Sequence, residues 1–399
     1  MQKIKEIHIF AMAAHGKGLS GGDRIFIEFA RRWQRKLSVK LYLNEEGRQM
    51  CRTQALEGGK NLKFVVWDTK KWQRLGFIVG YLARIQRSIS KALVLRIKDP
   101  GSTICYSASE FWMDSFPAFI LKLRFPAIRW VAAWYQTAPN PLRGYSEGER
   151  RESYRPSAML YWLAQLPVRP FISAFADFVL VNNDEEKNKF PRLDKKGKAI
   201  VVLGAVDVGR VEKWRSKNAN SRKIYDSVFQ GRFHPQKGVV ELIDIWKKVV
   251  GLVPRARLAM IGDGPLMENV KSQISRQRLQ KNIKLFGYMY DGPEKYLVFS
   301  QSKLVVHPAF YDSGGMAAAE AMAFGIPAVG FDLKSFKSYY PRGMEKVEIG
   351  NLEAFAHKIV ELLGDSALRD KLGKEAGQII GESWSWDTRA QEVLNKITS

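Results

Sequence analysis

Two acidic residues separated by seven positions, Asp312 and Glu320, stand on either side of a pair of glycines. The apolar run at 304–306 predicts a strand, and the segment 316–324 is rich in residues that favour a helix. The loop between them therefore ends at a helix N-terminus, where free N–H groups attract anions and glycines let a phosphate approach the backbone. Glu320 is the only charge in AAAEAMA. A carboxylate repels phosphate, so we expect it to hold a diol such as a ribose. The alternative is that Glu320 is a solvated helix residue and Asp312 a helix cap.

A second group of charges lies in the loop 231–238, GRFHPQKG, which follows a predicted strand at 228–230. Arg232 and Lys237 stand at opposite ends of this loop, beside the start of a predicted helix. A fork-shaped guanidinium and a mobile ammonium together suit a diphosphate with several oxygens. The alternative is a pair of exposed loop cations in a very basic chain.

The stretch 304–331 resembles the acid-x7-acid signature of retaining GT-B glycosyltransferases, in particular glycosyltransferase family 4. The family's E-A-M-A-x-G-x-P is intact at 320–327, whereas Asp312 replaces the Glu that members usually carry first. The loop 231–238 matches the family's G-R-x-x-x-x-K-G. The resemblance implies that Glu320 holds the nucleotide ribose and that Asp312 contacts hydroxyls of the donor sugar. It also implies that Arg232 and Lys237 stabilise the leaving diphosphate.

The same resemblance assigns further positions to the nucleotide sugar. They are Gly21 and Gly22 of the first glycine-rich loop, Gly262 and Gly264 of a G-x-G-P turn, Gly287 and Tyr288 after a strand, and Ser313, Gly314, Gly315 and Met316. In a proline-containing loop at 135–141, Gln136 stands where related enzymes often have a histidine near the acceptor. No dedicated base is evident, so we expect the acceptor to lose its proton late, to the leaving phosphate.

Predicted strands alternate with predicted helices in both halves of the chain, which is typical of parallel α/β sheets. We expect the GT-B fold class: two Rossmann-like, doubly wound parallel-sheet domains facing across a cleft. The expected N-terminal, acceptor-binding domain spans 1–206 and takes back the C-terminal helix at 384–399. The expected nucleotide-sugar domain spans 207–383. Asp23 is the expected cap of the first helix, and the charged stretch 211–223 is predicted to be a linker.

The composition is that of a globular protein, with 399 residues, 46% hydrophobic and 26% charged. Two cysteines make no disulfide framework and favour a reducing, cytoplasmic compartment. Five scattered histidines show no metal-ligand spacing. We therefore expect neither a metal nor a cofactor beyond the donor substrate. The N-terminus alternates like a strand and lacks the apolar region of a signal peptide, and no apolar run reaches the ~18 residues of a membrane span.

The net charge of +24 suggests an anionic partner. Basic residues recur in the N-terminal half beside Trp33, Trp72 and Phe77, as on helices that lie in a lipid interface. The basic residues are Arg31, Arg32, Arg35 and Lys36, then Lys70, Lys71 and Arg74, then Arg84, Arg87, Lys91, Arg96 and Lys98. Peripheral contact with the inner face of a membrane and a merely solvated basic surface are both consistent with this spacing.

The predicted function is transfer of a sugar from a nucleotide diphosphate sugar to the hydroxyl of a glycan or lipid-linked glycan, with retention of anomeric configuration and without a metal. A sugar-nucleotide epimerase or a phosphorylase of the same fold would share the donor site. A nucleic-acid-binding protein would account for the charge but not for the motifs. A Rossmann oxidoreductase would need G-x-G-x-x-G with an acid about twenty residues later, and this unit is absent. The sequence leaves the base (UDP and GDP among the candidates), the sugar and the acceptor open.

Overall fold

The computed structural model describes residues 3–16, 19–138, 156–218, 221–312 and 314–399. The chain divides into two compact units. Among the described residues, unit 1 contains those up to 204 and Trp386–Ser399, and unit 2 contains Ala205–Ser385. The chain passes from unit 1 to unit 2 after Gly204, close to the domain boundary that we expected at residue 206.

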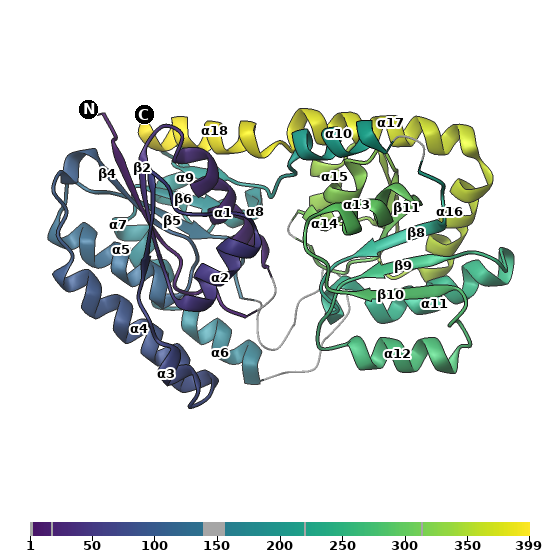
Figure 1. Cartoon of the computed structure of the whole chain (residues 1–399), viewed down its shortest axis with the longest axis horizontal. Helices are drawn as coiled ribbons and strands as arrows, with labels where there is room; N and C mark the ends of the chain where they lie inside the picture. Colours follow the sequence, from purple (N-terminus) through teal and green to yellow (C-terminus); the bar gives the residue numbers. More distant parts are fainter. Residues whose placement is uncertain (1–2, 17–18, 139–155, 219–220, 313) are drawn as a thin grey trace. The chain divides into compact units, whose positions relative to one another are not determined.

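Unit 1 is built on a seven-stranded sheet within the described residues, in the order β3-β2-β1-β4-β5-β6-β7. All of its strand pairs are parallel. The strands are β1 (Glu6–Phe10), β2 (Ser38–Leu43), β3 (Leu62–Val66), β4 (Thr103–Ser107), β5 (Arg129–Trp134), β6 (Phe178–Val181) and β7 (Ala199–Val201). The helices are α1 (Gly21–Trp33), α2 (Glu45–Thr53), α3 (Lys70–Gln73), α4 (Phe77–Val94), α5 (Trp112–Arg124), α6 (Pro156–Gln165), α7 (Val168–Phe175), α8 (Asp184–Lys187), α9 (Pro191–Asp194) and α18 (Trp386–Thr398) (Figure 1).

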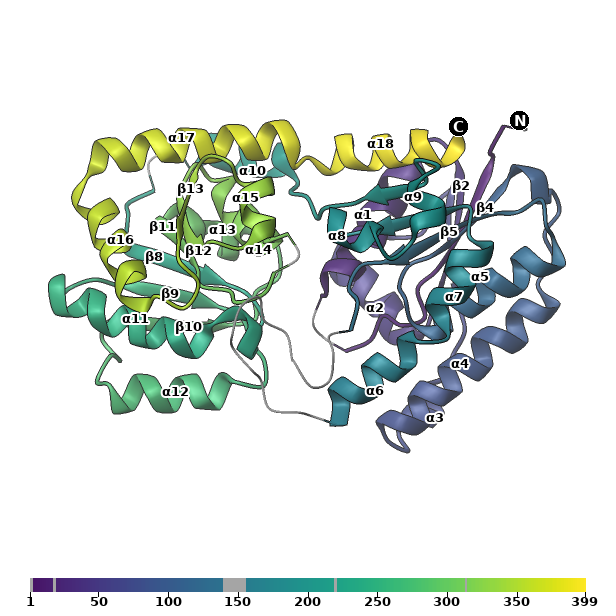
Figure 2. The ribbon, with the colours of Figure 1, turned by 180° about the vertical axis from the view of Figure 1, so that it is seen from behind.

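Unit 2 is built on a six-stranded sheet within the described residues, in the order β10-β9-β8-β11-β12-β13, again with every pair parallel. The strands are β8 (Tyr225–Gln230), β9 (Leu258–Ile261), β10 (Ile283–Gly287), β11 (Ser302–His307), β12 (Ala328–Phe331) and β13 (Met344–Val347). The helices are α10 (Val208–Lys217), α11 (Val239–Leu252), α12 (Met267–Arg276), α13 (Pro293–Ser300), α14 (Met316–Met322), α15 (Lys334–Tyr339), α16 (Leu352–Gly364) and α17 (Ser366–Ser383) (Figure 2).

Several strands of both sheets read as apolar runs, as strands that helices cover on both faces do. The run WVAAW in β5 and the run LAMI of β9 are buried at every position. The helices bury one face each, as α11 does with Val239, Leu242 and Trp246 at helical spacing. Parallel strands place their carboxyl ends at one edge of each sheet, so the loops that follow β8 and β11 meet at the same edge of unit 2.

Two expectations about local structure are wrong. The stretch predicted to be a linker contains helix α10, whose N-terminus is capped by the Asp207 side chain accepting a hydrogen bond from the Arg210 amide at 3.1 Å. The many charged residues suggested a linker, but they lie on a helix that buries only Val211 among its own residues. Helix α1 is capped by Ser20, and Asp23 is the third residue of the helix, completing a capping box with Ser20.

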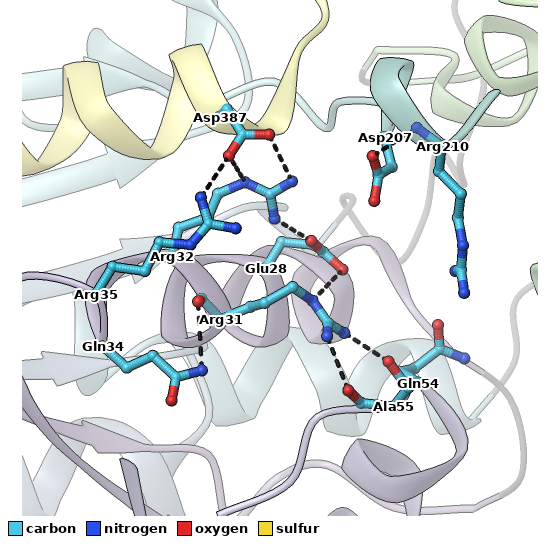
Figure 3. Close-up of polar contacts among 10 residues, drawn as sticks. All are labelled: Glu28, Arg31, Arg32, Gln34, Arg35, Gln54, Ala55, Asp207, Arg210 and Asp387. Carbon is cyan, nitrogen blue, oxygen red and sulfur yellow. Dashed lines mark hydrogen bonds and ion pairs between the residues drawn. The ribbon is translucent and has the colours of Figure 1, made fainter. Parts of the chain in front are cut away.

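The last helix, α18, packs on the first helix, α1, within unit 1. Figure 3 shows Asp387 of α18 directed at Arg32 and Arg35, each with a nitrogen 3.1 Å from the carboxylate. Glu28 pairs with Arg31 and Arg32 on the same helix. The indole of Trp33, which is buried, donates a hydrogen bond to the Ala390 carbonyl at 2.9 Å. This first basic cluster therefore attaches the last helix to the first helix.

We predict that Asp387→Ala lowers the free energy of unfolding of unit 1 by about 1–2 kcal/mol, because Arg32 is only 7% exposed and loses a charged acceptor. Urea denaturation of the full chain measures the change. The control is Glu382→Ala, which removes an ion pair with Arg342 between two exposed side chains and should cost less than about 1 kcal/mol. Equal losses in the two variants would contradict the role given to Asp387.

Candidate functional site

The two loops that carry the predicted chemistry lie side by side at the carboxyl edge of the unit 2 sheet. They follow β8 and β11, which are neighbouring parallel strands. The Phe310 amide of one loop donates to the Gln236 carbonyl of the other at 2.8 Å. Gly238 has a φ of +62°, and a side chain there would lie 2.0 Å from the Pro308 carbonyl oxygen. A glycine at 238 is therefore what allows the two loops to close on each other.

The Asp312 carboxylate is the centre of this junction. Its Oδ2 accepts from Lys237 Nζ at 2.6 Å and lies 2.8 Å from His307 Nε2. Its Oδ1 accepts from the backbone amides of Gly315 at 2.8 Å and Gly314 at 3.2 Å. Asp312 thus caps the turn that leads into α14 and pairs with the lysine of the neighbouring loop.

The electrostatics of this cluster keep Asp312 ionised. Burial alone raises the pKa of a carboxyl group, and the Asp312 side chain is only 9% exposed. The cation of Lys237 and the hydrogen bond and charge of His307 outweigh burial and hold the pKa of Asp312 well below its usual range. The site therefore carries a fixed negative charge beside a lysine that is itself only 15% exposed.

The turn at Gly315 requires the absence of a side chain. Gly315 has a φ of +63°, and a Cβ there would lie 2.9 Å from the Phe336 ring and 3.2 Å from the Tyr340 ring. The Tyr340 hydroxyl donates to the carbonyls of Gly314 and Gly315, both at 2.9 Å. Helix α14 begins at Met316, directly after this turn. Ser313, the remaining predicted member of this segment, lies outside the described residues.

Glu320 is buried in α14, with 7% of its surface exposed, so its interpretation as a solvated helix residue is wrong. Its Oε2 accepts from Lys295 Nζ at 2.6 Å and from Gln230 Nε2 at 2.8 Å. Lys295 is 2% exposed and also donates to Asp291 at 2.6 Å. The buried carboxylate is thus paired with a buried cation, as the cost of removing a charge from water demands.

The remaining cation of the loop after β8, Arg232, has an exposed side chain. The G-x-G-P turn packs beneath this loop. At Gly262, where φ is +148°, a Cβ would lie 1.9 Å from the Gly231 carbonyl oxygen, and at Gly264 it would lie 2.6 Å from that of Phe233. Because Gly262 and Gly264 have no side chains, their turn can pack directly against the loop that carries Arg232 and Lys237. Glycine is therefore required here by packing, whether or not the turn contacts a ligand.

The predicted base-binding pair ends β10. Gly287 has a φ of +70°, in the left-handed region that favours glycine. Tyr288 follows it with 41% of its surface exposed, and its ring packs edge-on against Tyr290 with centroids 5.0 Å apart. An exposed aromatic pair at a strand end offers a face on which a base can stack.

In unit 1, Gly21 and Gly22 form the first turn of α1, so they belong to the helix N-terminus rather than to the preceding loop. A side chain at Gly22 would lie 3.3 Å from the Tyr135 ring, which follows β5. The glycine thus lets the start of α1 approach the carboxyl end of β5.

Gln136 lies beside a buried carboxyl group that sequence reasoning missed. The backbone carbonyl of Gln136 accepts hydrogen bonds from Gln165 Nε2 at 2.7 Å and from the Tyr161 hydroxyl at 3.2 Å. Tyr161 also donates to Glu110 at 2.7 Å. Glu110 is 6% exposed, and burial raises its pKa. Its position shortly after β4 was the available signal, because strand ends in α/β domains carry ligand-binding residues.

Three residues of the unit 2 site also escaped prediction. His307 is the last residue of β11, and Gln230 is the last residue of β8. Both positions are again strand ends. Lys295 lies on α13, and no spacing in the sequence relates it to Glu320. Within the described residues, no group of three or more His, Cys, Asp or Glu side chains is placed to hold a metal ion.

Comparison with known proteins agrees with this geometry. Residues 210–378 match the family described as Glycosyl transferases group 1. A poly(ribitol-phosphate) alpha-N-acetylglucosaminyltransferase of Staphylococcus aureus is 27% identical over 186 residues, which are 46% of this chain and 37% of that protein. A poly(glycerol-phosphate) alpha-glucosyltransferase of Bacillus subtilis is 27% identical over 162 residues, 40% of this chain and 24% of that protein. The chain thus spans well under half the length of these two relatives.

The crystal structure of Anabaena HepE in complex with UDP and glucose aligns with a TM-score of 0.69 and 14% identity, covering 99% of this chain and 100% of that one. Such a likeness establishes the fold. The prediction of a GT-B fold class with two Rossmann-like, parallel-sheet domains is confirmed.

We predict that Asp312→Asn lowers the free energy of unfolding by about 3 kcal/mol at pH 7, because Lys237 and His307 lose a buried, charged partner. The folded pKa of Asp312 is depressed, so the stability it contributes is present above the unfolded pKa of about 3.9. That contribution is lost as the pH falls toward the folded pKa. Urea denaturation at several pH values should therefore show the difference from wild type shrinking below about pH 4.

The matched control is Asp332→Asn, whose partner Lys337 is 62% exposed, with an expected loss below about 1 kcal/mol. A loss for Asp312→Asn that stays constant down to pH 2 would contradict an ionised Asp312 in the folded protein.

Proposed function

We propose that this chain is a glycosyltransferase that moves a sugar from a nucleotide diphosphate sugar to an acceptor hydroxyl, with its donor site at the carboxyl edge of the unit 2 sheet. The observation that carries the proposal is the 2.6 Å contact between Lys237 and Asp312. It brings together two separately predicted motifs, the G-R-x-x-x-x-K-G loop and the acid-x7-acid segment. The match of residues 210–378 to Glycosyl transferases group 1 supports the same conclusion.

Lys237 and Arg232 are the groups that we assign to the leaving diphosphate. Breaking the bond between the anomeric carbon and the diphosphate oxygen leaves negative charge on that oxygen, and a nearby cation lowers the barrier. An ammonium has three donors, so Lys237 can keep Asp312 as one partner while it contacts a phosphate. Arg232 has an exposed side chain on the same loop and can turn toward the second phosphate. The start of α14 at Met316 adds backbone N–H donors.

Glu320 and Asp312 are the groups that we assign to the sugars. A carboxylate can accept about four hydrogen bonds, so Gln230 and Lys295 orient Glu320 without by themselves exhausting its capacity for the hydroxyls of a ribose. Asp312 already has four donors, so a hydroxyl of the transferred sugar would replace one of them at this rigid acceptor. Tyr288 offers the base a stacking face beside Gly287.

The finer features of the proposal are membership of glycosyltransferase family 4, retention of the anomeric configuration, and independence of metal. The intact E-A-M-A-x-G-x-P at 320–327 supports the first two. Two cations placed at the expected diphosphate support the third, because they supply the charge that a metal ion supplies elsewhere.

The substrates are proposed by chemical class. The Anabaena structure contains UDP and glucose, and the two bacterial relatives are named for sugar transfer to polyol-phosphate polymers, which favours a UDP-sugar and a role in polysaccharide biosynthesis. The acceptor is the hydroxyl of a glycan or a lipid-linked glycan. Gln136, with Glu110 and Tyr161 beside it, is the acceptor-side cluster of unit 1. Two free, buried cysteines, Cys51 and Cys105, are consistent with a cytoplasmic enzyme.

We predict that Arg232→Ala and Lys237→Ala each lower turnover at least 10²-fold with a UDP-sugar donor, because each removes charge that stabilises the departing diphosphate. Radiolabel transfer or coupled UDP release measures the rate. Lys247→Ala and Arg255→Ala, which remove exposed cations elsewhere in unit 2, should leave turnover within about twofold of wild type. Near wild-type rates in either loop variant would refute the leaving-group assignment. The same reaction run in EDTA, with the product anomer read by proton NMR, tests metal independence and retention.

We predict that UDP or its sugars raise the melting temperature by mass action more than GDP or ADP do at equal concentration. Glu320→Gln should reduce the shift given by UDP, because the ribose loses a charged acceptor, while the shift given by free pyrophosphate should stay unchanged. A thermal-shift titration of the full chain measures both. If no nucleotide shifts the melting temperature of the wild type, the proposed donor site is wrong.

A further inference from the structure

Helices α3 and α4 of unit 1 present large apolar side chains to solvent. Seven of them lie between residues 72 and 94. They are Trp72 (44% exposed), Leu75 (64%), Ile78 (66%), Val79 (37%), Leu82 (58%), Leu93 (53%) and Val94 (69%). Exposed apolar side chains concentrated in one segment, rather than scattered over the surface, are a feature of interaction sites.

The exposure follows from where α4 packs. Helix α5 covers β1, β4 and β5 of the sheet, and α4 packs on α5 as an outer layer (Figure 1). The inward side of α4 carries small or buried residues, including Gly80, Ser88 and Ala92. At 100° per residue, Ile78, Leu82 and Leu93 fall within about 60° of one another on the outward side. An ordinary surface helix is polar on that side, whereas α4 exposes mainly apolar side chains there, together with Gln86 and Arg87.

The charge of this segment has one sign. Between Lys70 and Lys98 the chain has eight Lys or Arg and no Asp or Glu. Six of these cations have exposed side chains, namely Lys70, Lys71, Arg74, Arg87, Arg96 and Lys98. Lys71 also lies 5.2 Å from the centre of the Trp72 ring, so a cation and an exposed indole stand together.

The structure separates this segment from the first basic cluster. Arg32, Arg35 and Trp33 are occupied by α18, and Lys36 donates to Gln391. The segment 70–98 instead presents its cations and its apolar side chains to solvent together. Of these two basic segments, only residues 70–98 combine exposed cations with several exposed apolar side chains, as a lipid interface requires. We call Lys70–Lys98 the α3–α4 face.

We propose that the α3–α4 face lies in the headgroup layer of an anionic lipid bilayer. Helix α4 has 18 residues and is therefore about 27 Å long, which is enough to lie along the surface with its apolar side at the acyl boundary. The cations at its edges and on α3 reach lipid phosphates, where each contributes favourably to binding. None of the helices in the described part of the chain is long and apolar enough to cross a membrane, so this contact is peripheral.

Charge distinguishes this occupant from a second copy of the chain. Two copies pairing through this face would bring the six exposed cations of one against the same six of the other, with no carboxylate of the segment between them. Like charges across an interface oppose association, whereas an anionic bilayer supplies complementary charge and an apolar layer at once. The proposal does not depend on the donor site, because its residues lie in unit 1 and none of them is assigned to that site.

The experiment is sedimentation of the full-length protein with sucrose-loaded vesicles of phosphatidylcholine alone or with about 30% phosphatidylglycerol. Wild type should bind the anionic vesicles at least tenfold more tightly than the neutral ones. The variant Ile78→Gln/Leu82→Gln should weaken binding to anionic vesicles at least tenfold, because two large apolar side chains no longer enter the acyl boundary. Glutamine retains the helix propensity of these positions.

Two control variants separate the α3–α4 face from general properties of the chain. Leu252→Gln/Leu297→Gln removes two exposed leucines from unit 2, 55% and 42% exposed, and should bind like wild type. Lys70→Gln/Lys71→Gln/Arg74→Gln should lose about fivefold per cation, whereas Lys247→Gln/Lys371→Gln/Lys374→Gln removes the same charge elsewhere and should lose much less. Melting temperatures and donor hydrolysis within about twofold of wild type establish that each variant is folded.

The outcomes are decisive for the proposal. Selective loss in the α3–α4 variants supports it. Equal binding by Ile78→Gln/Leu82→Gln and wild type, equal losses in the two charge variants, or no binding of wild type to anionic vesicles would each overturn it. A wild-type dimer in gel filtration that Ile78→Gln/Leu82→Gln converts to a monomer would assign the face to a second copy instead. Failure of the vesicle assay alongside normal sugar transfer would leave the proposed enzymatic function intact.

Discussion

The ionised carboxylate of Asp312 is the group on which the geometry of the unit 2 site depends. It is buried, and its charge is tolerated because a lysine, a histidine and two backbone amides surround it. These donors come from two loops and the end of one strand. A single carboxylate therefore fixes the turn before α14, the position of Lys237 and the orientation of His307 together. Glu320 repeats the arrangement one turn into the helix, with Lys295 as its buried partner.

Such pairs have a chemical consequence as well as a structural one. A cation held against a carboxylate is already desolvated and positioned, so under the proposed function a phosphate would meet an ordered ammonium rather than a mobile one. The glycines around the pair serve this order. Gly238 lets the two loops touch, Gly262 and Gly264 let the next turn pack beneath them, and Gly315 makes the tight turn into α14. The motif glycines are therefore required by the packing of the site as much as by any ligand.

Charge has two different roles in unit 1. The arginines of α1 are held by Glu28 and Asp387, and they attach the last helix to the first. The cations of the α3–α4 face surround an apolar surface that no described element covers. The sequence alone does not distinguish the basic cluster of α1 from the α3–α4 face, since both combine basic residues with a tryptophan. Burial separates them, because Trp33 is enclosed by α18 whereas Trp72 is 44% exposed.

The sequence by itself determined the fold class, the alternation of strands and helices in both halves, and the two motifs of the proposed donor site. Apolar strand runs, glycine positions and residue spacing are local properties, and local properties can be recognised in the sequence alone. Only the tertiary structure decided which charges meet. Lys295 with Glu320, Lys237 with Asp312, and Asp387 with Arg32 are joined across 25, 75 and 355 positions. The helical nature of 208–217 was likewise decided by packing, because its composition is that of a solvated linker. Contacts between distant segments depend on how helices and strands pack, so the spacing of residues along the chain does not predict these contacts.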